Sequence, residues 1–350
     1  MAANADGKGR LLERLERGPV ICAEGYLFEL ERRGYVQAGP YVPEVVLDHP
    51  EVVAQLSREF VRAGSDVVPA FTYYAHRDKM RLVGKEHLLE EINRTALAIA
   101  KEVASEHDSL VAGDICNTNV FAEDEATRDA ARAMFEEQVA WASDAGVDFV
   151  IGETFSYAEE ALAALAAIKA ADLPAAITMA VHQHPVTREG WTLADACRRL
   201  EDAGADVVGL NCMRGPSTML PLLEEIRKAV TVHVAALPVP YRTHEREPTF
   251  QSLRDPDCTC LPSEMPFPTA LDPFMCNRYE IAEFGRAAHA TGIGYLGLCC
   301  GGAPHLVRSL AEALGRTPPA SRYSPDMSRH AYFGTDERLK KENLAFSKEL

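Results

Sequence analysis

The chain has 350 residues, of which 47% are hydrophobic and 25% charged, and its formal net charge is −16. This is the composition of a globular protein with a large core, arranged as one α/β domain or as two smaller ones. The acidic balance argues against nucleic acid and membrane as partners, because their phosphate groups would repel the surface. No apolar run reaches the 18 residues that indicate a membrane span.

The N-terminal segment MAANADGKGR lacks the apolar core of a signal peptide, so we expect a cytoplasmic protein. Nine cysteines are present, and their odd number weighs against a framework of disulfides. In a reducing compartment, clustered cysteines indicate metal binding or catalysis, whereas isolated ones indicate packing.

Short β-branched runs recur along the chain, and several follow a helix-like segment that closes with Ala-Gly-x-Asp or a close variant. Glycine in that position is typical of a helix end. The helical patterns include residues 50–64, 159–171, 192–204 and 217–229. The segments that carry the predicted strands are 18–24, 62–71, 109–115, 144–153, 174–181, 202–211, 231–238 and 290–299.

These strands show no polar alternation, which is typical of strands buried on both faces of a parallel sheet. Eight strand–helix units over about 300 residues predict a single (β/α)8 TIM barrel, an α/β fold, for residues 11–316. The alternative is a doubly wound open sheet. It is disfavoured because ICAEGYLF, after the first strand, is not a glycine-rich phosphate loop.

Two segments depart from the barrel pattern. Residues 239–275 form a long insertion rich in Pro, Thr, Asp and Cys, and so long a loop is usually functional or mobile. Residues 317–350 form a C-terminal extension that we expect to end in a polar helix, DERLKKENLAFSKEL (336–350). We expect this extension to act as an oligomerisation arm, and the protein to be a homo-oligomer.

Functional residues of such a barrel lie at the C-terminal ends of its strands. Three cysteines stand there: Cys212 after the sixth strand, and Cys299 and Cys300 after the eighth. Three thiolates leave one position open on a tetrahedral zinc ion, as in catalytic sites. Such a site would hold an incoming thiol as a nucleophilic thiolate. Other residues at strand ends are Glu24, Tyr73, Tyr74, Asp114, Asn117, Glu153, His182, His184, Asn211, Pro238 and Tyr241.

Simpler interpretations remain open for several of these residues. Any single cysteine is more often core than ligand, and we expect Cys22, Cys116, Cys197 and Cys276 to be packing residues. The pair Cys258 and Cys260 has metal-binding spacing but no second pair nearby. His182 and His184 form the His-x-His pattern of barrel metallohydrolases, but no acidic partner is evident, so we favour a surface loop.

The segments VVGLNC, ending in Cys212, and GYLGLCCGG, carrying Cys299 and Cys300, resemble the zinc motifs of the homocysteine S-methyltransferase family. The resemblance is strongest to the betaine-using branch of that family. It extends to FELERRGYVQAGPYVPE (28–44), FTYYA (71–75), ETFSYAEEA (153–161) and DMSRHAYFGTDERLKKENL (326–344). It implies a zinc-dependent S-methyltransferase that moves a methyl group from a betaine-like onium donor to homocysteine or a related thiol.

The resemblance also implies roles for individual residues. Cys212, Cys299 and Cys300 would bind zinc, and Asn211 would orient Cys212. Tyr74 matches a catalytic tyrosine beside the open coordination position, and Glu153 matches a carboxylate that binds the acceptor's amino group. A quaternary ammonium is held by aromatic faces, and Tyr41, Tyr73 and Tyr74 are available for this.

Four positions depart from the family pattern. Ala23 stands at the place of a first-strand aspartate, and Glu24 and Gly25 follow it in the turn expected to contact the acceptor. A one-residue shift reverses side-chain direction on a strand, so Glu24 substitutes only if the turn is rebuilt. Ala70, Thr154 and Leu298 replace a threonine, a tyrosine and a glycine, respectively. We therefore expect altered substrates, the alternative being a catalytically silent zinc-binding protein.

Overall fold

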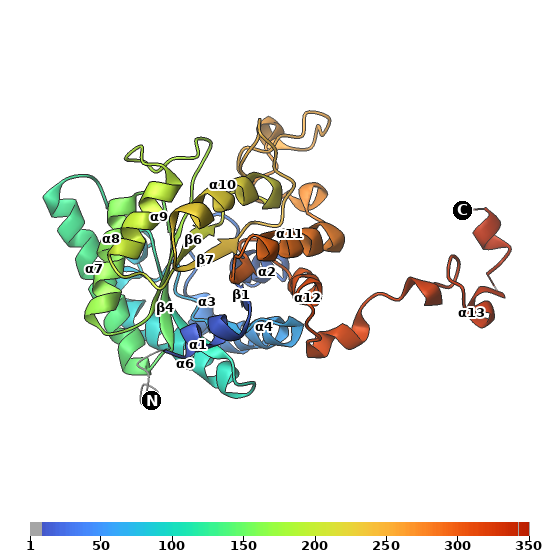
Figure 1. Cartoon of the computed structure of the whole chain (residues 1–350), viewed down its shortest axis with the longest axis horizontal. Coiled ribbons are helices and arrows are strands. Elements are labelled where there is room, and N and C mark those ends of the chain that lie inside the picture. Colours follow the sequence, from blue (N-terminus) through green and yellow to red (C-terminus); the bar gives the residue numbers. More distant parts are fainter. Residues whose placement is uncertain (1–8, 342, 350) are drawn as a thin grey trace.

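The computed structural model describes residues 9–341 and 343–349. Most of the N-terminal segment MAANADGKGR, which lacks the apolar core of a signal peptide, lies outside these ranges. Eight parallel strands pair in chain order, and the eighth returns to the first to close a barrel (Figure 1). The predicted TIM barrel is confirmed. The strands are β1 (Val20–Ala23), β2 (Val67–Pro69), β3 (Leu110–Cys116), β4 (Phe149–Phe155), β5 (Ala175–Met179), β6 (Val207–Asn211), β7 (His233–Leu237) and β8 (Tyr295–Leu298).

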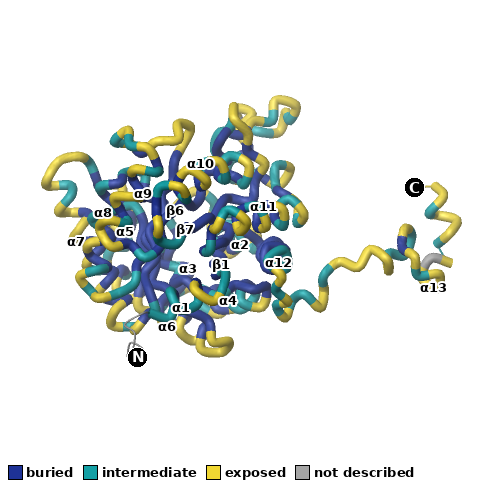
Figure 2. Tube along the Cα trace, viewed as in Figure 1, coloured by how far each residue is buried: buried dark blue, intermediate teal, exposed yellow. Residues whose placement is uncertain are grey.

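Helices surround the barrel, and the strands form its most buried part (Figure 2). The four predicted helical patterns correspond to α4 (Pro50–Ala63), α8 (Ala158–Ala170), α9 (Leu193–Asp202) and α10 (Pro216–Ala229). The other long helices are α1 (Arg10–Arg17), α6 (Leu89–Ser105), α7 (Glu125–Ala145), α11 (Arg278–Ala290) and α12 (Pro304–Ala313). Three shorter helices, α2 (Tyr26–Arg32), α3 (Val45–Asp48) and α5 (Arg77–Leu82), lie in the loops after β1 and β2.

The repeated Ala-Gly-x-Asp pattern has a structural explanation. In three copies the aspartate accepts a hydrogen bond from a backbone N–H at the start of a neighbouring strand. The donors to Asp66, Asp148 and Asp206 are the N–H groups of Ile21, Val111 and Ala175, each at 2.8 Å. These hydrogen bonds lie at the N-terminal end of the barrel, which serves stability rather than catalysis. The repeat therefore fixes the strand register at that end.

Strand periodicity decides which side chains enter the barrel, because successive residues point to opposite faces. Cys22, Ala112 and Ile151 belong to the apolar cluster inside the barrel. The residues two positions later are Glu24, Asp114 and Glu153, which therefore form the next interior layer, at the C-terminal mouth. Ala23 and Leu298 belong instead to the cluster between strands and helices.

The insertion between β7 and α11 packs over the barrel mouth. Tyr241, Phe250 and Leu271 from this segment form a buried apolar cluster with Cys212 and Cys299. The insertion is therefore a wall of the mouth. Cys258 and Cys260 are bonded to each other as a disulfide, so the metal-binding alternative for this pair is not supported.

The C-terminal extension begins against the barrel and then leaves it (Figure 1). Arg308 of α12 donates to the carbonyl oxygens of Ala320 and Tyr323 at 3.3 and 3.4 Å. The predicted final helix is wrong in length: α13 covers Glu337–Lys341, and a short 3-10 turn follows at Phe346–Lys348. So short a helix gains little from its own hydrogen bonds when no packing partner covers it.

Within residues 9–341 and 343–349, no helix has both the length and the apolar character needed to cross a bilayer.

Candidate active site

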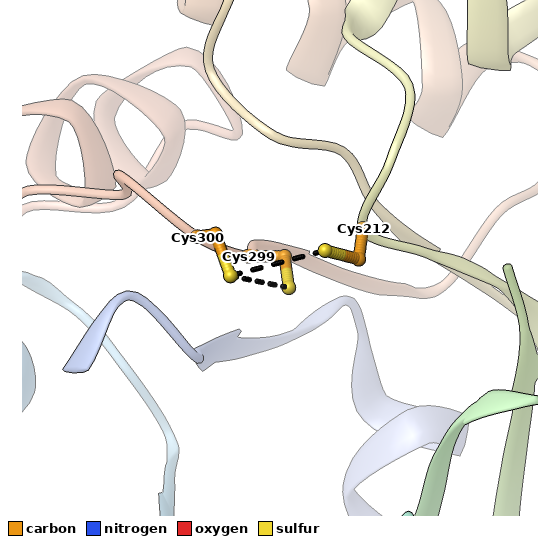
Figure 3. Close-up of side chains that lie close together, drawn as sticks. All are labelled: Cys212, Cys299 and Cys300. Carbon is orange, nitrogen blue, oxygen red and sulfur yellow. Dashed lines mark hydrogen bonds between the residues drawn. The ribbon is translucent and has the colours of Figure 1, made fainter. Parts of the chain in front are cut away.

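Three thiols meet at the C-terminal mouth of the barrel (Figure 3). Cys300 Sγ lies 3.8 Å from Cys212 Sγ and 4.0 Å from Cys299 Sγ, and all three sulfurs lie within 4.8 Å of one another. Sulfurs bound to a tetrahedral zinc ion at about 2.3 Å would lie about 3.8 Å apart. The donor set and its spacing therefore fit a metal ion.

The turns after β6 and β8 bring these thiols together. The backbone N–H groups of Cys212 and Cys299 donate to the carbonyl oxygens of Leu237 and Pro238, at the end of β7. Cys212 adopts a left-handed conformation, with φ of 56°. Gly301 has φ of 89°, and a Cβ atom there would lie 2.3 Å from the Tyr241 hydroxyl. Glycine thus permits the turn that directs both adjacent cysteines to one point.

Three carboxylates from separate strands lie beside the thiols. Oxygen atoms of Glu24 and Glu153 lie within 4.8 Å of each other and of Cys299 Sγ. Burial, reinforced by the neighbouring carboxylates, raises the pKa of Glu24 and Asp114 well above the usual range. Burial and then the Cys212 charge raise the pKa of Glu153 to about 7.

Two of these carboxylates have oxygens without a partner. Glu24 Oε2 and Asp114 Oδ1 are buried and accept no hydrogen bond from the described residues. Such atoms are costly unless a bound group satisfies them, and an ammonium supplies the required N–H donors and charge. Asp114 stands at a strand end in the sequence but is not among the predicted site residues.

Asn211 connects the carboxylates to the thiols from behind the cavity wall. Its Nδ2 donates to Glu153 Oε2 and to Thr154 Oγ1, and it lies 3.9 Å from Cys299 Sγ. Its Oδ1 accepts from the Thr154 N–H and from Thr178 Oγ1, each at 2.9 Å. Asn211 is therefore a positioning residue rather than part of the cavity surface.

The thiols and carboxylates line one cavity of about 180 Å³. Tyr73 and Tyr74 are also in its wall, with the aromatic rings of Phe28, Phe250 and Phe267. Within the described part of the chain, Gly25, Tyr41 and Asn211 do not reach this wall. Gly25 packs against the last barrel turn, where an added Cβ would lie 1.9 Å from the Gly302 carbonyl oxygen.

The three tyrosines expected to hold an onium donor surround a lysine of the same chain. Lys79 Nζ lies 5.8, 4.7 and 5.3 Å from the ring centroids of Tyr41, Tyr73 and Tyr74. It also donates to Cys116 Sγ at 3.1 Å and to the Asn117 carbonyl oxygen at 3.2 Å. The Lys79 side chain is 2% exposed and has no carboxylate partner among the described residues. The cage predicted between these rings is thus filled by the protein itself.

The four departures from the family pattern separate into two pairs. Ala70 and Thr154 line the cavity. Ala23 and Leu298 face the helices, because they occupy the alternate strand positions. The departures at Ala23, Ala70, Thr154 and Leu298 are all expected from the sequence to lie in the pocket, and this expectation is wrong for Ala23 and Leu298. Glu24 enters the cavity by ordinary strand alternation, without a rebuilt turn.

The two histidines after β5 are not part of the three-thiol centre. His182 and His184 are exposed, and neither joins a potential metal-binding group among the described residues. Cys22, Cys116, Cys197 and Cys276 are buried, as expected for packing residues. The hydrolase interpretation has no support in this geometry.

Fold and site together define a TIM-barrel protein with a three-thiol centre suited to a metal ion. The family model for homocysteine S-methyltransferase matches residues 21–314. The S-methylmethionine–homocysteine S-methyltransferase BHMT2 of Pongo abelii is 36% identical over 337 residues, covering 91% of this chain and 86% of its own. Betaine–homocysteine S-methyltransferase 1 of Mus musculus is 36% identical over 331 residues, covering 91% and 79%.

Among solved structures, the metallated form of the homocysteine methyltransferase MmuM from Escherichia coli is similar, with a TM-score of 0.67 at 16% identity. That match covers 86% of this chain and 98% of the other, and it supports the fold. The chain belongs to the homocysteine S-methyltransferase family. Membership makes it a methyltransferase acting on small molecules.

Proposed function

We propose that the protein is a zinc-dependent S-methyltransferase that moves a methyl group from a betaine-like onium donor to homocysteine or a related thiol. One observation carries the proposal: three thiols at tetrahedral spacing share a cavity with two carboxylates that each have one buried oxygen without a partner among the described residues. An acceptor that carries both a thiol and an ammonium group would bind the metal through its thiol and these carboxylates through its ammonium. A reducing compartment such as the cytoplasm suits this chemistry, because the thiols must stay reduced.

Cys212, Cys299 and Cys300 would hold the zinc ion, which when bound lowers the pKa of an incoming thiol and favours its thiolate. Glu153 and Glu24 would bind the acceptor's ammonium by charge-assisted hydrogen bonds. Asn211 keeps the Glu153 carboxylate directed at the cavity. Tyr74 lies in the same wall, where its ring would contact the donor.

The transfer is an in-line displacement. The acceptor sulfur forms a bond to the methyl carbon while the bond from that carbon to the donor's nitrogen or sulfur breaks, and the donor leaves as a neutral amine or sulfide. Opposite charges disappear in this step. Displacement of water from the site by the two substrates favours this step, because water then no longer stabilises the separated charges of the reactants.

The test uses full-length protein loaded with zinc. Homocysteine and related thiols are combined with glycine betaine and with S-methylmethionine, and methylated products are quantified by mass spectrometry. We expect turnover with at least one pair, and loss of both zinc and turnover in Cys212→Ala. Cys197→Ala, at a buried cysteine inside α9, should retain both. Zinc-loaded protein that methylates no thiol would instead support the silent zinc-binding alternative.

A further inference from the structure

A second cavity of about 340 Å³ adjoins the thiol cavity. The two share three wall residues, Tyr73, Thr154 and Met213. The second cavity continues between the loops after β3, β4 and β5, where Asn117, Ser156 and His182 also line it. A ligand that passes Thr154 would therefore extend from one cavity into the other.

The sizes of the cavities indicate that both are used. Small-molecule sites usually measure roughly 300–1,000 Å³. The thiol cavity alone, at about 180 Å³, is small for a reaction that brings two substrates together. With the second cavity included, the space reaches the usual range.

The charges of the two cavities differ. The described wall of the thiol cavity contains three carboxylates and no cationic side chain. Arg188 is in the wall of the second cavity, with its guanidinium 5.6 Å from the Tyr157 ring centroid and no ion-pair partner among the described residues. The one acid in that wall, Glu160, already accepts hydrogen bonds from the Thr118 N–H and hydroxyl at 2.7 Å.

Lys79 adds a second positive charge behind the shared wall. Its ammonium donates to the carbonyl oxygen of Asn117, which lines the second cavity, and it lies over the ring of Tyr73, which lines both. A donor bearing only a positive charge beside Tyr73 would be repelled by this ammonium. A donor that also carries an anion would offset both cationic groups.

We propose that the methyl donor is a zwitterion whose onium centre lies beside Tyr73 and Tyr74 and whose anionic tail extends past Thr154 to Arg188. The chemical class is an onium carboxylate longer than glycine betaine, with several bonds between the positive and negative groups. This inference rests on the proposed methyltransferase function. It assigns the second cavity as the donor's tail site and Arg188 as a specificity-determining residue.

The experiment uses zinc-loaded full-length protein, homocysteine and three probes. They are glycine betaine, 4-trimethylammoniobutanoate, and pentyltrimethylammonium, which has a tail of comparable length without the carboxylate. Donor KM and kcat are measured for each. We expect 4-trimethylammoniobutanoate to have the lowest KM, and Arg188→Gln to raise that KM about tenfold while kcat stays within twofold. The KM of pentyltrimethylammonium should not change, and Arg188→Lys should restore part of the difference.

Arg199→Gln is the matched control, because Arg199 is another exposed arginine stacked on an aromatic ring, 4.0 Å from the Trp191 centroid. It should behave as the parent protein does. Equal KM values for the butanoate and pentyl compounds, or no response to Arg188→Gln, would overturn the tail site while leaving methyl transfer intact. Failure of every onium compound to methylate any thiol would instead refute the proposed function, and the tail site with it.

Discussion

At the residue scale, strand alternation decides which polar side chains can meet a ligand. Glu24, Asp114 and Glu153 each follow an interior apolar residue by two positions, so all three face the mouth of the barrel. Ala23, one residue before Glu24, faces the helical layer and is fully buried. These two neighbouring residues therefore lie in different environments, so substitution of Glu24 should affect ligand binding and substitution of Ala23 should affect stability.

Glu24→Gln should weaken acceptor binding without removing the metal. A charge-assisted hydrogen bond contributes about 1.5–3 kcal/mol, so the KM for the thiol acceptor should rise at least tenfold. Donor KM and bound zinc should stay unchanged, as steady-state kinetics and metal analysis would show. An unchanged acceptor KM would mean that Glu24 does not contact the acceptor.

Ala23→Asp should destabilise the fold rather than improve the use of homocysteine. The new carboxylate would lie in the apolar layer between strands and helices, where an unpaired charge costs several kcal/mol. The urea midpoint of unfolding should fall markedly. A stable variant with improved homocysteine kinetics would show that residue 23 faces the cavity.

At the element scale, the short helix α5 positions Lys79 beneath the tyrosines. Its N-cap is His76, which is 1% exposed and whose Nδ1 accepts a hydrogen bond from the Lys79 N–H. His76 Nε2 has no partner among the described residues. Burial, and then the charge of Lys79, lower the pKa of His76 to about 2. The helix therefore depends on a neutral imidazole.

This dependence predicts how stability changes with pH. Below about pH 6.5, His76 is protonated in the unfolded chain but not in the folded one, so its contribution is present above pH 6.5 and is lost as pH falls. Between pH 8 and pH 5 the loss should be about 2 kcal/mol. His76→Asn keeps an N-cap acceptor and should lose correspondingly less in urea unfolding. The same pH dependence in both proteins would contradict the assignment.

At the scale of the whole molecule, the barrel and its C-terminal extension differ in how far their apolar residues are buried. The barrel buries its strands within a ring of helices, whereas much of the extension is exposed (Figure 2). Met327, Phe333 and Phe346 in the extension are 56–60% exposed. Large apolar side chains left uncovered in this way indicate an interaction surface. A second copy of the chain is the partner we propose.

Removal of residues 325–350 should therefore reduce the mass of the particle in solution. Residues up to Tyr323 are retained because Arg308 holds them against α12, so the barrel should remain folded. Size-exclusion chromatography with light scattering gives the mass, and circular dichroism checks the fold. An unchanged mass with intact fold would refute the arm.

Much of this arrangement follows from sequence pattern. β-branched runs at regular spacing define the barrel, and the cysteines after β6 and β8 predict the three-thiol centre. The filling of the tyrosine cage by Lys79 was not predicted, because it depends on contacts between β2, β3 and α5 that no local pattern records. The inward orientation of Asp114 was also not predicted, although the alternation of strand residues was sufficient to predict it. The orientations of Ala23 and Leu298 could also have been read from strand alternation.

Zinc-edge X-ray absorption spectroscopy of the purified protein gives the most direct test of a three-thiol zinc site, because it counts the atoms bound to the metal. We expect one zinc ion with three sulfur ligands at about 2.3 Å and one lighter atom. Saturation with the acceptor thiol should raise the number of sulfur ligands to four. A zinc ion bound mainly by nitrogen or oxygen, or a spectrum unchanged by the thiol, would contradict it.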